Sequence, residues 1–255
     1  MRYLQYGLHG FERITLTNNG EYYPINNHLF KSIHLSDDVK QMTVELKDGI
    51  TYEEYKSEIE AYLNQICFNM IINSDVGLNA PYRTIEIIQD KENNTAQKEV
   101  KIFDYATFRD EVIIEKHTGA NSFYESIVNK PTAIDKHFLL YERIFKTLFN
   151  PIRVVQFLSL YQFLYELLSK GKPRPAQAYV VEYIQNHKDR YPHIGFKLSR
   201  KNGKDEDSLT YLRNEISHAE DTNDFNLYSQ LGTQITDFQI KQILMILNDV
   251  IIELP

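Results

Sequence analysis

This sequence has a single cysteine and no long apolar run, and both shortages exclude classes of protein. With only Cys67, the chain has no internal disulfide and no cysteine-based metal cluster. No stretch of about 18 consecutive apolar residues occurs, so we expect no membrane span. The first residues lack the charged-then-apolar layout of a signal peptide. Together these features predict a soluble, cytoplasmic protein.

Sequence motifs for common cofactors are missing as well. There is no glycine-rich nucleotide-binding loop, no His-Glu-x-x-His pattern and no pair of Cys or His residues at metal-ligand spacing. We therefore expect neither a cofactor nor a bound metal. A metal-dependent hydrolase ranks third among the functional hypotheses, because the acidic residues are many but none shows ligand spacing.

Positive charge is scarce overall, and its distribution is uneven. The net charge of −7 argues against a nucleic-acid partner, but residues 1–130 hold 13 Lys and Arg against 20 Asp and Glu, whereas residues 131–255 hold 15 of each. A basic run within the second part contains Lys197, Arg200, Lys201 and Lys204. A local basic patch can bind a phosphate backbone even on a neutral domain, so these four residues are candidate substrate-binding residues. A solvated loop explains the same run.

The first 130 residues predict an α+β domain. Alternating segments and turn signals surround one long helix, which we expect to begin at Thr51 with a capping box to Glu54 and to end near Asn73. The clearest predicted strands are residues 41–47, 82–90, 98–104 and 110–115. This order predicts an antiparallel or mixed sheet with the helix on one face. We expect Cys67 to be a small core residue of that helix.

The pattern becomes helical after Asn129-Lys-Pro131, which we take as the domain boundary. Residues 131–255 predict an all-α bundle of five helices. We expect these helices at residues 132–149, 152–169, 176–187, 207–220 and 237–252, the last with Thr236 as its cap. The second helix is apolar on nearly all sides and must therefore be central, or be shared with a partner subunit.

The fourth of these helices carries the most informative residues. Asp207 or Ser208 is suited to cap it. At about 100° per residue, one apolar stripe forms from Leu209, Leu212, Ile216 and Ala219. The opposite side gathers Arg213, Asn214, Ser217 and His218. This helix therefore turns an arginine, an amide, a hydroxyl and an imidazole away from its own core.

The pattern Arg213-Asn214-x-x-x-His218 resembles the signature of the HEPN superfamily, in which a histidine follows an arginine by four to six residues. The resemblance covers residues 131–255 and implies a HEPN-like helical bundle. It implies a metal-independent endoribonuclease of a toxin–antitoxin, abortive-infection or other antiviral system, with RNA as substrate and tRNA as one option. It also implies a homodimer formed through the bundle. An antitoxin or a phage-derived trigger would be a further partner, and residues 1–130 would sense, regulate or recognise the substrate.

The chemistry of RNA cleavage suits these residue types. Histidine suits proton transfer because its pKa lies near neutrality, so we expect His218 to be the acid or base. The guanidinium fork matches phosphate oxygens, so we expect Arg213 to bind the scissile phosphate and to stabilise the transition state. Asn214 would orient the imidazole or bind phosphate, and Ser217 would position the substrate.

Two other interpretations of the same residues stay open. The bundle could be a non-catalytic module that binds RNA, a nucleotide or a protein, as the acidic first half favours. Alternatively, the four residues form an ordinary polar helix face. In that case Arg213 would pair with Glu220 or Asp224, and His218 would simply be solvated.

Overall fold

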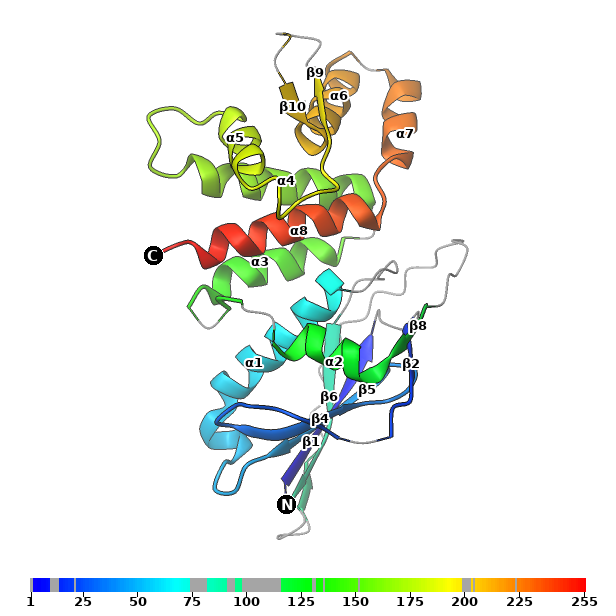
Figure 1. Ribbon diagram of the computed structural model, residues 1–255, viewed down its shortest axis with the longest axis vertical. Coiled ribbons are helices and arrows are strands. Elements are labelled where there is room, and N and C mark those ends of the chain that lie inside the picture. The colour runs from blue at the N-terminus through cyan, green and yellow to red at the C-terminus, as the bar shows by residue number, and fades with distance from the viewer. Residues whose placement is uncertain are drawn as a thin grey trace. The chain divides into compact units, whose positions relative to one another are not determined.

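The computed structural model describes residues 2–9, 14–20, 22–73, 82–90, 95–97, 116–129, 132–134, 136–150, 152–198, 203, 205–222 and 224–255 (Figure 1). The chain divides into two compact units, Met1–Phe145 and Lys146–Pro255. This division lies later in the chain than the boundary predicted at residue 130. The predicted α+β class is confirmed, since strands and helices both contribute to the fold. None of the helices that the structure describes has the length and apolarity needed to cross a bilayer.

The first unit is built on an antiparallel sheet in the order β3-β4-β5-β1-β6-β7. Its strands are β1 (Arg2–His9), β3 (Tyr23–Pro24), β4 (Phe30–Leu35), β5 (Gln41–Leu46), β6 (Tyr82–Asp90) and β7 (Thr95–Gln97). A separate parallel pair joins β2 (Ile14–Thr17) to β8 (Lys116–Gly119). The strands predicted at residues 41–47 and 82–90 are confirmed, whereas those predicted at 98–104 and 110–115 lie outside the described residues.

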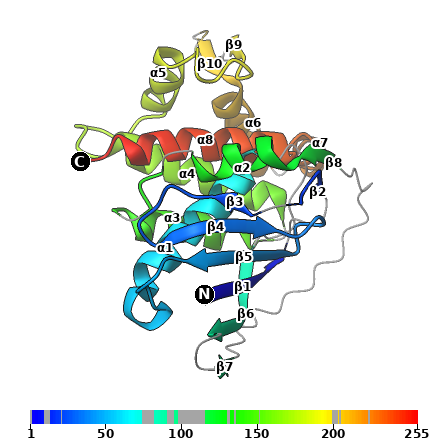
Figure 2. The same cartoon turned by 60° about the horizontal axis from the view of Figure 1, so that its bottom comes forward.

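Period-two alternation gives this sheet one apolar face. The register places Leu4 opposite Val44 and Tyr6 opposite Met42, and all four side chains are buried. Helices α1 (Tyr52–Asn73) and α2 (Ala120–Val128) pack on this face (Figure 2). The predicted long helix is thus confirmed, with Glu54 N–H donating to Thr51 Oγ1 at 3.3 Å. The prediction did not include α2.

Aromatic and amide contacts fix the two helices. The rings of Phe30 on β4 and Tyr62 on α1 stack with centroids 5.1 Å apart. The Asn69 amide donates to the carbonyl oxygen of Ile127 at 2.8 Å and so ties α1 to α2. Cys67 is buried in α1, as predicted.

Helix α3 (Phe138–Leu148) begins later than predicted. The prediction of a helix from Thr132 is wrong for its first residues, where Ala133 N–H donates to the Tyr141 hydroxyl at 3.1 Å instead of opening a helix. Tyr141 makes an edge contact with Phe68 of α1, with centroids 5.1 Å apart. This packing assigns the first turns of α3 to the first unit, which explains why the division lies beyond residue 130.

The second unit is mainly helical. Its elements are α4 (Arg153–Ser169), α5 (Ala178–Asn186), β9 (Phe196–Leu198), β10 (Asp205–Asp207), α6 (Ser208–Asp221), α7 (Phe225–Thr233) and α8 (Asp237–Ile252). Helix α4 contacts α5, α6 and α8, which confirms its predicted central position. Thr236 caps α8, as predicted, and the structure shows that it does so through a capping box with Gln239. The prediction missed α7, and it treated the antiparallel β9–β10 hairpin as part of a basic loop.

Candidate functional site

Helix α6 begins at a buried carboxylate, and this cap sets the direction in which its polar residues point. Asp207 is the N-cap and accepts hydrogen bonds from the N–H groups of Leu209 at 3.0 Å and Thr210 at 2.9 Å. The Thr210 hydroxyl donates to the second carboxylate oxygen at 2.5 Å. The Tyr161 hydroxyl of α4 lies 2.7 Å from the Thr210 hydroxyl. The first of the two predicted caps is therefore the correct one, and it also anchors α6 to α4.

Burial dominates the titration behaviour of this anchor. It raises the pKa of Asp207 above its ordinary value, although the hydrogen bonds from Thr210 and Leu209 lower it in part. Burial likewise raises the pKa of Tyr161, and the charge of Asp207 adds to that rise. The Arg213 guanidinium acts in the opposite direction on Tyr161. Arg213 therefore acts electrostatically on the Tyr161 hydroxyl of this anchor.

The predicted apolar stripe of α6 is buried, and the predicted polar side is turned outwards. Leu209, Leu212, Ile216 and Ala219 are all buried. Arg213, Asn214 and Ser217 are partly exposed, and His218 is exposed. The helical prediction for this segment, with its assignment of faces, is thus confirmed.

Asn214 is the centre of a hydrogen-bond cluster that joins three elements. Its amide oxygen accepts from the Arg213 guanidinium at 3.2 Å and from the Gln177 amide at 3.0 Å. Its amide nitrogen donates to the Glu206 carboxylate of β10 at 3.3 Å. The amide is therefore engaged on both sides. We predicted that Asn214 would orient the imidazole of His218 or bind phosphate. In the structure its amide instead bonds to the Arg213 guanidinium.

Arg213 is not neutralised by an acidic side chain within the described part of the chain. Within the described residues, the guanidinium donates to the neutral amide oxygen of Asn214. The ion pair with Glu220 or Asp224, which the polar-face interpretation required, does not occur among these residues. The guanidinium thus keeps donor capacity towards solvent, where it can bind an anion.

His218 lies in the last turn of α6, where the imidazole is exposed. It is four residues from Asn214, about 40° around the helix, but five residues and about 140° from Arg213. One copy of the helix therefore does not bring the guanidinium and the imidazole to a common point. A site that uses both needs substrate wrapped around the helix or a second copy of it.

The remaining predicted residues surround this cluster only in part. Ser217 is partly exposed on α6. Lys197 of β9 pairs in register with Glu206, and its ammonium lies 5.1 Å from the centre of the Tyr211 ring. Three of the predicted basic residues, Arg200, Lys201 and Lys204, lie outside the described residues.

Sequence reasoning missed the two residues that fix Asn214. Gln177 lies 37 positions away, and Glu206 belongs to a hairpin that the sequence pattern did not reveal. The only signal for Glu206 was its place directly before the cap, which is too weak to identify a partner. Among the described residues, no group of three His, Cys, Asp or Glu side chains is arranged to hold a metal ion.

Comparisons of this chain with models of protein families, with curated proteins and with solved structures give no match.

Proposed function

We propose that this chain is a metal-independent endoribonuclease whose active site is built on α6. The supporting observation is the surface of α6, where Asn214 holds an arginine that pairs with no acidic side chain in the described residues, and the next turn exposes His218. Arg213 binds the scissile phosphate and stabilises the negative charge that develops on it. His218 transfers protons, and Asn214 keeps the guanidinium in place.

The reaction needs no water in its first step. A base removes the proton of the ribose 2′-hydroxyl, and the 2′-oxygen forms a bond to phosphorus. The bond from phosphorus to the 5′-oxygen then breaks, and an acid delivers a proton to that leaving oxygen. The products carry a 2′,3′-cyclic phosphate and a 5′-hydroxyl. We expect Ser217 and Lys197 to contact the RNA beside the cluster.

The angle between Arg213 and His218 favours a site shared by two copies of the chain. With about 140° between them on one helix, Arg213 of one copy would face His218 of the other. This arrangement makes a homodimer the active form. The resemblance to the HEPN superfamily extends the proposal to a toxin or antiviral effector, restrained by an antitoxin or released by a phage component.

The first test is RNA cleavage in excess EDTA, with the product ends mapped. We expect His218→Ala to lower the rate by about 10²–10⁴-fold and Arg213→Ala by about 10²–10³-fold. His193→Ala is the matched control, because this exposed imidazole lies in the same unit but beside Phe238 of α8. Cleavage by His218→Ala at the wild-type rate, with the fold intact, would exclude the proposal.

A mixing experiment tests the shared site. When Arg213→Ala and His218→Ala chains are mixed in equal amounts and allowed to exchange, half of the dimers contain one chain of each kind. Each mixed dimer regains one of its two sites, so about one quarter of the wild-type activity should return. A site contained within one chain would give no recovery.

One observation favours a non-catalytic binding module as the second candidate. The Glu206 carboxylate bonds to Asn214 and so places negative charge beside Arg213. A module of this kind would bind RNA in a salt-dependent way without cutting it, and Arg213→Ala would leave that binding unchanged.

A further inference from the structure

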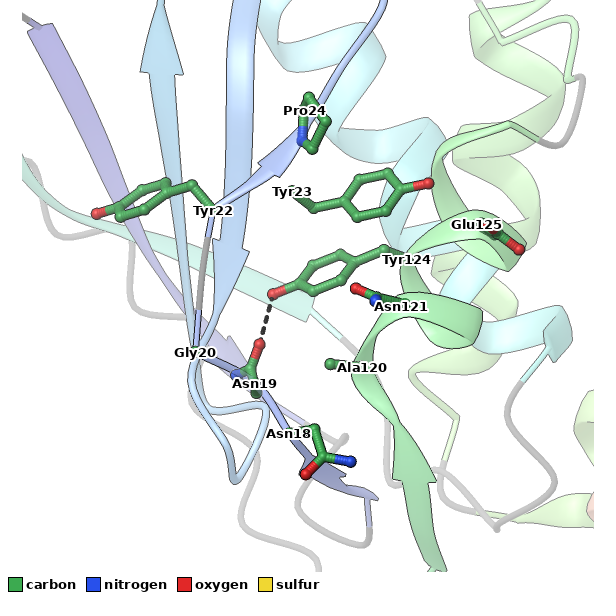
Figure 3. Close-up of a pocket in the computed structure, with 10 residues that line it drawn as sticks. All are labelled: Asn18, Asn19, Gly20, Tyr22, Tyr23, Pro24, Ala120, Asn121, Tyr124 and Glu125. Atoms are coloured by element: carbon green, nitrogen blue, oxygen red, sulfur yellow. Dashed lines mark hydrogen bonds between the residues drawn. The ribbon is translucent and has the colours of Figure 1, made fainter.

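A pocket of about 460 Å³ lies within the first unit, and none of its described lining residues belongs to the proposed active site. Its walls come from the turn Asn18–Gly20 after β2, from the edge strand β3 and from the first turns of α2 (Figure 3). The volume falls within the range of about 300–1,000 Å³ that is typical of small-molecule sites. Nothing in the proposed ribonuclease mechanism uses this pocket.

One wall of the pocket is fixed by a closed set of hydrogen bonds. The hydroxyl of buried Tyr124 accepts from Leu35 N–H at 2.7 Å. It also donates to the Asn19 amide oxygen at 3.1 Å (Figure 3). The Asn19 amide nitrogen in turn donates to the Leu35 carbonyl at 2.6 Å and to the Asp37 carboxylate at 3.1 Å. Because these groups are satisfied by one another, they shape the pocket without competing for its ligand.

An aromatic platform forms the same side of the pocket. The rings of Tyr23 and Tyr124 are stacked, with centroids 5.0 Å apart and planes at 15° (Figure 3). Tyr124 is buried and Tyr23 is partly exposed, and among the described residues no other ring lies against Tyr23. A flat ring can therefore continue this stack from the solvent side, as unpaired bases do on aromatic side chains.

Two side-chain amides of the pocket lining stay available to a ligand. Asn18 and Asn121 are both exposed, and neither makes a side-chain hydrogen bond within the described residues. Figure 3 shows Asn121 on α2 beside the Tyr124 ring, and Asn18 at the opposite end of the pocket lining from Tyr23, beyond Asn19. An asparagine amide offers one donor and one acceptor side by side, which matches the adjacent donor and acceptor on the edge of a nucleobase. Helix α2 also begins at Gly119 without a side-chain cap, so no cap side chain accepts from the backbone N–H groups of its first turn.

The charge of the pocket selects against anions. Among the described lining residues, Glu125 carries the only formal charge, and none is Lys, Arg or His. Behind the wall, the Asp37 carboxylate adds to the rise in the pKa of Tyr124 that burial causes. A phosphate or carboxylate ligand would approach these negative charges without a cationic side chain to bind it.

We propose that this pocket binds a neutral nucleoside, with the base stacked on Tyr23 and its edge bonded to Asn121. The Glu125 carboxylate is available to accept from a ribose hydroxyl. A free nucleoside and an unpaired base at the end of an RNA share this chemistry. The pocket stands independently of the proposed ribonuclease activity, because none of its residues belongs to the α6 cluster.

The test is isothermal titration calorimetry of the full chain with the four ribonucleosides, their 5′-monophosphates and glucose. We expect at least one nucleoside to bind with a Kd below about 1 mM, and its 5′-monophosphate to bind at least about threefold more weakly. Asn121→Ala should weaken nucleoside binding by about fivefold or more. Asn129→Ala is the matched control, because it changes an exposed asparagine at the other end of α2 and should leave the affinity unchanged.

Two tyrosine variants separate stacking from folding. Tyr23→Phe keeps the ring and should bind as wild type, whereas Tyr23→Ala removes it and should bind at least about tenfold more weakly, with its fold checked by circular dichroism. Any of three results would overturn the inference. They are no nucleoside binding at about 5 mM, equal binding of glucose, and tighter binding of the monophosphate, which would assign the ligand to the α2 N-terminus instead of the tyrosine stack.

Discussion

The buried N-cap of α6 supports the sharpest prediction about stability. Asp207 is fully buried, and its carboxylate accepts from two backbone N–H groups and from the Thr210 hydroxyl. Asp207→Ala removes both carboxylate oxygens and with them all three hydrogen bonds. It leaves the Thr210 hydroxyl with Tyr161 as its remaining partner and leaves the first turn of α6 uncapped.

The expected loss follows from two contributions. Removing an N-cap side chain costs about 1 kcal/mol. Leaving buried donors unsatisfied costs about 1–3 kcal/mol more. The raised pKa of Asp207 means that its own charge is destabilised by burial, and removing that carboxylate offsets part of the loss. We therefore expect the free energy of unfolding to fall by about 2 kcal/mol, which lowers Tm by about 4–8 °C in a chain of this size.

Asp207→Asn is the matched control for this prediction. Asparagine caps helices as well as aspartate does, and its amide can donate to the Thr210 hydroxyl if that hydroxyl then donates to Tyr161. We expect the Asn variant to unfold within about 1 kcal/mol of wild type at neutral pH. Thermal unfolding followed by circular dichroism measures both variants. An Ala variant that melts with wild type would refute the role of this cap.

The pH dependence of the same pair gives an independent check. Burial raises the folded-state pKa of Asp207 above 3.8, its ordinary value in the unfolded chain. The stability that Asp207 contributes through this shift is therefore fully present below pH 3.8, and it is lost as the pH rises through the folded-state pKa. The Asn variant has no such dependence. The stability of wild type relative to Asp207→Asn should therefore fall from about pH 4 upwards, and a rise would contradict the assignment.

Four further predictions concern single positions. Gln156→Ala should lower the free energy of unfolding by about 2 kcal/mol, because this buried amide donates to two backbone carbonyls at 2.9 and 2.6 Å, and urea denaturation would measure the loss. Gly171→Ala should lower the free energy of unfolding by about 1 kcal/mol, because the backbone has φ of +76°, which disfavours a side chain. An added Cβ meets no atom within 4 Å, so no steric clash adds to this cost. An unchanged denaturation midpoint would show that the turn relaxes. Burial raises the pKa of Tyr62 to about 12, so wild type should lose stability relative to Tyr62→Phe between about pH 10 and 12, and absorbance at high pH would show whether one tyrosine titrates this late. Glu206→Gln keeps an acceptor for Asn214 but removes a negative charge beside Arg213, so RNA should bind about fivefold more tightly at low salt, and equal affinity would separate Glu206 from the RNA surface.

Local sequence patterns were sufficient to predict those helices and caps whose structure depends on nearby residues alone. Helical spacing predicted α1, α4, α5, α6 and α8, because an apolar stripe of several turns is visible without knowledge of its partner. The caps Asp207 and Thr236 were predictable for the same reason, since each bonds to N–H groups two or three residues along the chain. That Arg213 and His218 both point away from the buried stripe of α6 followed from that spacing alone.

Contacts between distant segments decided the rest. Helix α2 has only nine residues and no side-chain cap, and it is held by Tyr124, whose hydroxyl bonds to residues of β4 and of the turn after β2. The start of α3 depends on Tyr141 meeting Phe68 of α1, which no local pattern contains. Short elements of this kind gain most of their stability from packing, so their own sequences do not reveal them.

The same division applies to the two candidate sites. The sequence by itself determined which functional groups α6 presents and that they point away from its core. Only the tertiary structure decided that the Asn214 amide is held by Gln177 and Glu206, and that residues 105 positions apart, Asn19 and Tyr124, build one wall of a pocket. Side-chain identity and helical period are local properties, whereas a hydrogen-bond partner or a cavity exists only once separate segments pack together.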